Sequence, residues 1–204
     1  MPEEQGLSLF IFTYIRMFFL LAPFFGVSMF LKMSEPMSNT EKRKAVFRAS
    51  VAVFIAIYAF FFFGKPLFLM LGITLAAFQI GAGSILFISS AMLVLGISNR
   101  SKYEPDSDDF AIVPLAMPVI VGPGTIGTLM VWGTQITGFS DRLIVCEAFC
   151  AIGITVGIFL ALSEQIQKLL GHKILSIIIK ITALILTALA AQIVFTGIKT
   201  FMTN

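Results

Sequence analysis

Long apolar stretches alternate with short polar segments along almost the whole chain. A membrane-spanning helix needs about 20 mostly apolar residues, because each residue adds about 1.5 Å along the axis. The stretches that reach this length predict six transmembrane helices: Leu7–Leu31, Ala45–Phe63, Phe78–Ile97, Phe110–Trp132, Leu143–Leu162 and Ile174–Ile198. The apolar run Leu67–Ala77 is too short to cross alone. We expect it to extend the third span as a half-helix or to lie at the membrane interface.

The composition supports this interpretation. Hydrophobic residues make up 58% of the chain and charged residues 12%, and the mean hydropathy is +0.98. A soluble domain usually has about 25% charged residues. We therefore expect an all-α, polytopic integral membrane protein whose main partner is the lipid bilayer. The net charge of +3 does not indicate nucleic-acid binding, because the basic residues lie in short loops and no base-stacking or phosphate-binding motif accompanies them.

The distribution of Lys and Arg predicts the orientation of the chain. The loops after the first, third and fifth spans carry most of these residues, including Lys42–Lys44 and Arg100. The other face has only Lys65, Arg142 and Lys199. By the positive-inside rule, both termini should lie outside the cell. The first apolar run follows Glu3 and Glu4 rather than a basic segment, so we interpret it as a retained span and not as a signal peptide.

Two clusters of helix-breaking residues interrupt the apolar stretches about half a chain apart. They are Ala22–Gly26 and Pro118–Gly124. A broken helix persists in a membrane only where protein or a water-filled cavity covers the break. Paired breaks in two halves of a chain point to a transporter's binding site. With two polar midspan residues, they give the predicted substrate-binding set: Pro23, Gly26, Pro118, Gly122, Pro123, Gly124, Thr125, Gln79 and Gln192.

The second cluster predicts an unwound segment followed by a new half-helix. The N–H groups at the start of that helix would attract a carboxylate, and carbonyls freed near Pro23 and Pro118 would accept from an ammonium group. The hydroxyls of Thr125 and Thr128 lie in the first turn, where they would cap the helix or touch a ligand. The alternative is that the Gly and Pro residues serve only kinks and packing, and that Gln79 and Gln192 bond between helices.

Three ionisable residues fall at membrane depth: Arg16, Glu147 and Lys180. Charges at this depth are costly and are usually paired or functional. Lys180 is near enough to the end of its span to snorkel toward the interface. An ion pair between Arg16 and Glu147 is one arrangement that the sequence allows. If protons drive a transport cycle, Glu147 is the one carboxylate placed to carry them.

A weak internal repeat relates the two halves. A shift of 100 residues places Pro23 over Pro123, and a shift of 101 places Gly96 over Gly197 and Gln79 over Lys180. Each half has three spans, so the second half enters the membrane from the opposite side. We therefore predict two inverted three-helix repeats, residues 1–101 and 102–204, forming one membrane domain.

Enzymatic chemistry is not indicated. The sequence has no HExxH or GxSxG motif, and its single histidine, His172, lies in a loop. Cys146 and Cys150 lie one turn apart on one helix, which does not suit a disulfide, and two thiols are too few for a metal site. We expect no catalytic residue, no metal and no cofactor.

The stretch from Ile112 to Gly124, IVPLAMPVIVGPG, resembles the signature of the MarC-type membrane proteins, also classed as small neutral amino acid transporters. The segments Gly72–Phe87 and Ala191–Ile198 also fit that family's pattern. The resemblance implies a six-span protein of the bacterial inner membrane. Some relatives move glycine, alanine or similar amino acids, coupled to a cation gradient. The family usually has Asn or Asp where this chain has Ala22, and often Gly where it has Ala183.

The hypothesis from the sequence is a secondary transporter or exporter of small neutral amino acids or similar zwitterions, working by alternating access. A proton or a sodium ion is the expected coupling ion. The alternatives are a non-transporting membrane subunit or assembly factor, a multidrug efflux protein and an enzyme for a lipid-linked substrate. The sequence leaves open the substrate, the direction of transport, the choice of ion and the oligomeric state.

Overall fold

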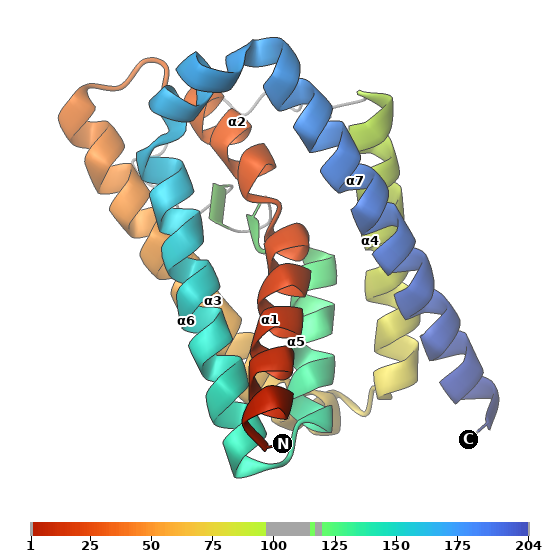
Figure 1. The fold of residues 1–204 in the computed structure, drawn as a ribbon. Helices are drawn as coiled ribbons and strands as arrows, with labels where there is room; N and C mark the ends of the chain where they lie inside the picture. Colours follow the sequence, from red (N-terminus) through yellow and green to blue (C-terminus); the bar gives the residue numbers. More distant parts are fainter. Residues whose placement is uncertain (1, 97–114, 117–119, 204) are drawn as a thin grey trace.

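The computed structural model describes residues 2–96, 115–116 and 120–203, and these residues form an all-helical protein (Figure 1). The helices are α1 (Pro2–Leu21), α2 (Pro23–Met33), α3 (Asn39–Leu71), α4 (Leu75–Leu95), α5 (Pro123–Gln135), α6 (Phe139–Ala161) and α7 (Ser163–Thr203). In this part of the chain, five helical segments are long and apolar enough to cross a membrane. The predicted class, an all-α polytopic membrane protein, is confirmed.

Two of the six predicted spans differ from single helices. The first is broken near its middle, and the fourth lies partly outside the described residues. The first consists of α1 and α2, which together make one crossing segment, Gly6–Met33. The fourth was predicted over Phe110–Trp132, and its described helical part is α5, which has only 13 residues. The other four predicted spans correspond to α3, α4, α6 and α7, whose ends differ from the predicted ones by several residues.

The short apolar run Leu67–Ala77 is divided between two helices. Leu75–Ala77 begin α4 and so extend the third span, whereas Leu67–Leu71 end α3, which continues through Pro66. The alternative, a place at the membrane interface, stays a prediction. A proline removes one helical hydrogen bond, and Pro66 stands less than two turns before the end of α3. Gly72 follows with a φ of 63° and ends the segment before α4 begins. Gly171, with a φ of 71°, similarly separates the first turns of α7 from its long apolar part.

The two halves of the chain run through the molecule in opposite directions (Figure 1). The segment α1–α2 leads away from the end that holds the N-terminus, α3 returns, and α4 leads away again. In the second half, α5 runs toward the end with the termini, α6 leads away, and α7 brings the C-terminus back. Both termini therefore lie at one end of the bundle, which we call the terminal end. The other end is called the loop end.

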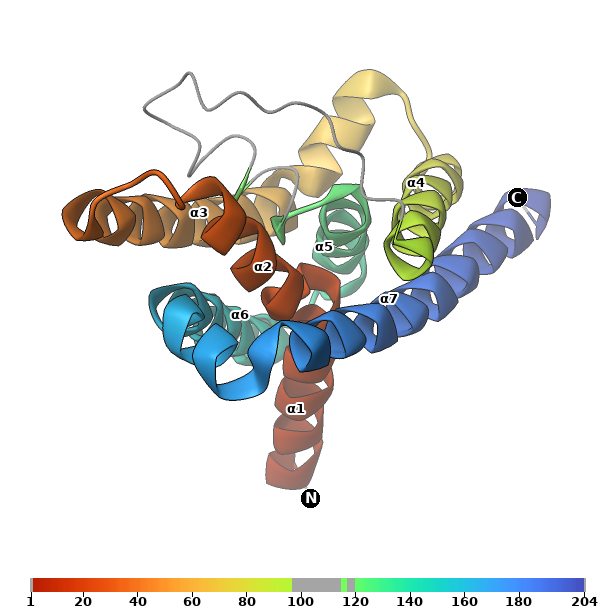
Figure 2. The same ribbon diagram turned by 90° about the horizontal axis from the view of Figure 1, so that it is seen from above.

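Glycines allow several helices to approach closely. A Cβ on Gly197 of α7 would lie 2.9 Å from the Ala76 carbonyl oxygen of α4, and one on Gly83 would lie 2.8 Å from Val194. Helices α4 and α7 accordingly pack along most of their length, and Figure 2 shows them side by side at one edge of the bundle. Such small-residue contacts are the usual means of helix packing in membranes.

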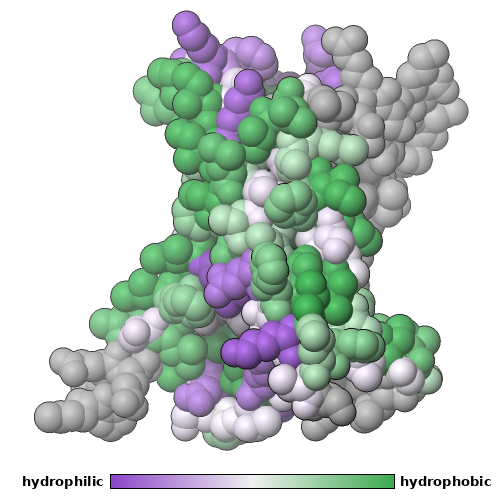
Figure 3. All heavy atoms as spheres, turned by 90° about the vertical axis from the view of Figure 1, so that its right-hand side faces the viewer, coloured by the Kyte–Doolittle hydropathy of each residue, from purple (hydrophilic) through white to green (hydrophobic). Residues whose placement is uncertain are grey.

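The core lies between α1, α3, α5 and α6. Its large, fully buried side chains include Met17, Phe61, Leu129 and Phe149. Many other large apolar side chains point outward, as lipid-facing residues must. Figure 3, which views the molecule from the side of α7, shows hydrophobic residues over much of the surface. Hydrophilic residues gather at the loop end and in a separate patch nearer the terminal end.

Candidate functional site

The first helix break is a single residue, Ala22, between α1 and α2. Its backbone is left-handed, with φ 43° and ψ 61°, which is unusual for a residue other than glycine. Pro23 begins α2 and has no N–H, while the N–H of Phe25 donates to the Ala22 carbonyl at 2.9 Å. In an unbroken helix the Leu20 carbonyl would accept from the N–H of Phe24, so the turn at Ala22 leaves it in need of another donor.

The second break lies at Gly122. Its backbone is extended, with φ −81° and ψ 175°, and α5 begins at Pro123, the first helical position that proline favours. The predicted new half-helix is therefore present. The possible cap by Thr125 or Thr128 is not, because no side chain caps the start of α5. The hydroxyl of Thr128 instead donates to the Gly124 carbonyl at 2.9 Å.

The two breaks touch one another inside the protein. The hydroxyl of Thr125, which is only 1% exposed, donates to the Leu20 carbonyl at 3.1 Å. Gly26 of α2 packs against Ile120, whose Cγ1 would lie 3.2 Å from a Cβ at the glycine. The second break thus satisfies a carbonyl that the first one frees. We call this contact region the crossing.

The crossing itself is packed by side chains. Gly124 is buried against the side chain of Leu86, and a Cβ on Gly127 would lie 2.9 Å from the Cβ of Ala82. These glycines let α4 approach the first turns of α5. Pro23 is also buried. Pro118, another predicted binding residue, lies outside the described residues. The structure therefore brings the two predicted breaks together, but it covers the start of α5 with apolar neighbours.

A polar cavity of about 180 Å³ lies next to the crossing, toward the terminal end. Four helices, α1, α4, α5 and α7, contribute its walls. It brings together the two predicted glutamines, Gln79 and Gln192, which are far apart in the sequence. Its lining consists of Arg16, Gln79, Thr128, Val131, Trp132, Gln135, Gln192, Ile193 and Thr196. Of the predicted binding residues that the structure describes, the two glutamines are the ones that line this cavity.

Among the described residues that line the polar cavity, Arg16 is the charged one. Its guanidinium carbon lies 5.2 Å from the ring centroid of Trp132 and 5.9 Å from that of Phe12, within reach of cation–π attraction. Among the described residues, its buried Nε has no hydrogen-bond partner. The possible pair with Glu147 is not formed, since Glu147 is exposed and no ion pair joins the two in this part of the chain. The sequence showed Arg16 as a charge at membrane depth but gave no sign of its place in the cavity.

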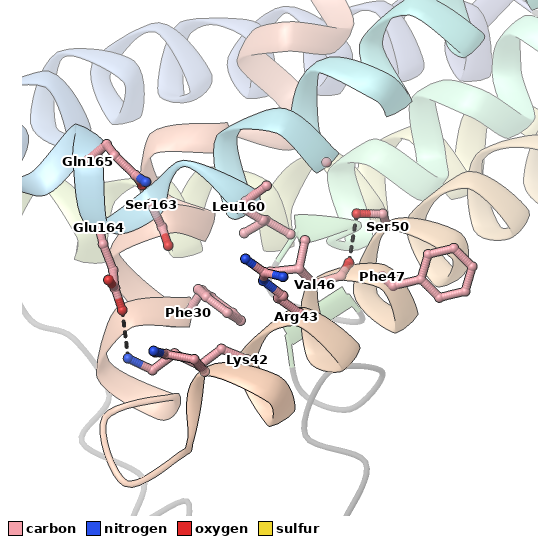
Figure 4. A pocket seen from close by; sticks show the side chains of 13 residues that line it. Phe30, Lys42, Arg43, Val46, Phe47, Ser50, Leu160, Ser163, Glu164 and Gln165 are labelled. Carbon is pink, nitrogen blue, oxygen red and sulfur yellow. Dashed lines mark hydrogen bonds and ion pairs between the residues drawn. The ribbon is translucent and has the colours of Figure 1, made fainter.

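Two larger cavities open at the loop end. One, of about 710 Å³, lies between α2, α4 and α7 and is lined by Lys32, Lys180 and other polar residues. We call it the vestibule. The other, of about 670 Å³, lies between α2, α3, α6 and α7. Figure 4 shows this second cavity, with the guanidinium of Arg43 turned into it and an ion pair of 2.7 Å between Lys42 and Glu164 at its edge. None of the predicted binding residues lines either one.

The chain offers little to hold a metal. Within the described ranges, no group of three or more His, Cys, Asp and Glu side chains gathers closely enough to bind an ion. Cys146 and Cys150 are free thiols on α6. The arrangement of the polar cavity can hydrogen-bond a small polar solute and neutralise a negative charge on it.

These features define a polytopic helical membrane protein in which two interrupted helices meet beside a small polar cavity. The chain belongs to the MarC family, because the model of that family, described as "MarC family integral membrane protein", matches residues 7–202.

Three relatives that are similar to this chain share one designation. A "UPF0056 membrane protein" of Aquifex aeolicus is 30% identical over 98% of this chain and 96% of its own length. Similar proteins of Pyrococcus abyssi (29% identical, 96% of each chain) and Buchnera aphidicola (29% identical, 94% of this chain and 92% of the relative) carry the same designation. No solved structure matches the chain.

Proposed function

We propose that this protein is a secondary transporter of small neutral amino acids or similar small zwitterions and that it works by alternating access. The observation that carries the proposal is the polar cavity, where Arg16 stands beside the crossing of the two helix breaks and its buried Nε has no hydrogen-bond partner among the described residues. An ionised residue at membrane depth is costly and most often marks a pathway for a substrate or an ion. A carboxylate on the solute would supply the missing partner.

The chemistry of the cavity selects the class of solute. A guanidinium binds a carboxylate through two parallel hydrogen bonds, so Arg16 would hold the acidic end of the solute. The amide oxygens of Gln79 and Gln192 would accept hydrogen bonds from the ammonium end. Drug-sized ligands occupy pockets of roughly 300–1,000 Å³. A cavity of about 180 Å³ fits a smaller solute, such as glycine or alanine.

This assignment moves the carboxylate away from the position expected from the sequence. The first turn of α5 was the expected partner, but Gly124 packs against Leu86 and Thr125 is bonded to Leu20. Arg16 lines the polar cavity, and its Nε has no hydrogen-bond partner among the described residues. We therefore propose Arg16 as the group that holds the carboxylate, one turn and a half before the first break.

An inverted repeat would supply the conformational change. Three features support such a repeat of residues 1–101 and 102–204. Corresponding helices run in opposite directions (Figure 1). The breaks at Ala22 and Gly122 are 100 residues apart, and the left-handed Gly72 and Gly171 are 99 apart. Inverted repeats that rock against each other around a fixed midplane site are a common basis of alternating access. The bacterial inner membrane, with both termini outside, remains the proposed setting.

Transport by the purified protein tests this proposal. Proteoliposomes loaded with unlabelled alanine should take up labelled alanine or glycine by counterflow, and an imposed proton or sodium gradient should identify the coupling ion. Arg16→Gln should lower the rate roughly 10- to 100-fold, since hydrogen bonds to charged groups contribute about 1.5–3 kcal/mol. Lys199→Gln, an exposed cation near the end of α7, is the matched control and should have no effect. If no small amino acid moves under any gradient or by counterflow, the proposal is wrong.

A further inference from the structure

We infer that the vestibule and the polar cavity are two equivalent entrances to one solute path, related by the inverted repeat and opening at opposite membrane faces. The inference rests on the proposed transport function and adds the second entrance, its residues and the state that the structure represents.

Parts of the two linings correspond. A shift of 100 residues carries Ser28, Leu31, Lys32 and Glu35 of the vestibule onto Thr128, Val131, Trp132 and Gln135 of the polar cavity. A shift of 101, which also aligns Gly96 with Gly197, carries Gln79 of the polar cavity onto Lys180 of the vestibule. These five pairs account for five of the nine residues that line the polar cavity.

The same helices contribute in mirrored order. The vestibule is built from α2, the end of α4 and the beginning of the apolar part of α7. The polar cavity is built from α5, the beginning of α4 and the end of α7, with Arg16 added from α1. A two-fold axis in the membrane plane would exchange these sets and would place the two cavities at opposite faces. Gln79 and Lys180 are then the same position in the two repeats.

The crossing lies between the two cavities. The Thr125 to Leu20 hydrogen bond and the contact of Gly26 with Ile120 close the space between them. The vestibule holds about 710 Å³ and the polar cavity about 180 Å³. Two equivalent entrances that differ this much in size indicate a protein open at the loop end and narrowed at the terminal end. In the state that is open at the terminal end, the polar cavity would be the larger of the two and the vestibule the smaller.

The charges of the vestibule suit the same solute. Lys32, Lys168 and Lys180 outnumber Glu35 in its lining, while Lys42 is paired with Glu164. An excess of positive charge in a cleft raises the local concentration of anionic groups. The vestibule would thus attract the carboxylate end of a zwitterion, which Arg16 holds on the other side of the crossing.

Labelling of single cysteines tests the inference. In a background with Cys146→Ala and Cys150→Ala, Ser28→Cys reports on the vestibule and Thr196→Cys on the polar cavity. A membrane-impermeant maleimide should reach the first from one face of the proteoliposome and the second only from the other. Added alanine should shift the two labelling rates in opposite directions, each by at least about twofold, because it changes the populations of the two states. Exposed Thr40→Cys and Thr200→Cys, at the same two ends but outside both cavities, should not respond.

Two results would overturn the inference, and they differ in what else they affect. If the background protein transports alanine but both cysteines react from one face, or both rates move together or not at all, the second entrance is wrong and the transport function stands. If alanine neither moves across the membrane nor changes any labelling rate, the transport function fails as well.

Discussion

The two helix breaks occupy the same place in their halves but differ in backbone. Ala22, before Pro23, is left-handed, whereas Gly122, before Pro123, is extended. At position 22 the chain has alanine in a left-handed conformation that favours glycine. At position 122 it has glycine in an extended conformation that most residues adopt. A left-handed residue other than glycine costs about 1–2 kcal/mol. The first break is therefore strained and the second is not, and the second supplies the Thr125 hydroxyl that satisfies the first.

This difference bears on position 22, where the resemblance to MarC-type proteins leads us to expect Asn or Asp. Asn and Asp are the residues, after glycine, that adopt the left-handed conformation most readily. Ala22 is buried and does not line the polar cavity. An Asn or Asp at this position would thus serve the turn itself. With Ala22 the break is strained, and this position takes no part in the lining of the polar cavity.

Loss of the link between the breaks should have the largest effect on stability. Thr125→Val keeps the side-chain shape but leaves the Leu20 carbonyl without its donor, and a buried unsatisfied group costs about 1–3 kcal/mol. Unfolding of the purified protein in detergent should reveal a loss of that size. Thr125→Ser retains the hydroxyl and should lose less. A Val variant as stable as the parent would mean that the crossing does not depend on this hydrogen bond.

A substitution that relieves the backbone strain at Ala22 should increase the stability of the protein, by less than the loss expected for Thr125→Val. Ala22→Asn should stabilise the protein by about 1 kcal/mol, because Asn tolerates the left-handed backbone. Ala22→Val should destabilise it, since a β-branched residue fits that conformation least. The same unfolding assay measures both variants. A destabilised Asn variant together with an unaffected Val variant would contradict the strain at Ala22.

Substitution at the unstrained break, Gly122, should change the stability of the protein least. Alanine is compatible with the extended backbone of Gly122, so Gly122→Ala carries no backbone strain and should change stability by less than about 1 kcal/mol. Gly122→Ala and Ala22→Val, compared in one unfolding series, measure the contrast between the two breaks directly. A larger loss from Gly122→Ala than from Thr125→Val would reverse the contrast.

The sequence predicted the helices well and the cavity only in part. Apolar length located the spans, and the proline clusters located both breaks, because these signals are local. The first part of the run Leu67–Ala77 ends α3 instead of extending the third span, because Pro66 near a helix end does not stop the helix. The place of Arg16 in the polar cavity and the left-handed turn at Ala22 depend on which helices pack together, and local patterns do not contain that information. The sequence repeat aligned Gln79 with Lys180. The structure adds that Gln79 lines the polar cavity and Lys180 lines the vestibule.

Binding of alanine to the purified protein, measured by calorimetry, tests most directly whether the polar cavity holds a small zwitterion. Alanine is compared with ethylamine, which lacks the carboxylate, and with propionate, which lacks the ammonium group. The account predicts that alanine binds, that ethylamine does not, and that Arg16→Gln weakens alanine binding roughly 10- to 100-fold. Equal binding of ethylamine and alanine, or an Arg16→Gln variant with unchanged affinity, would contradict it.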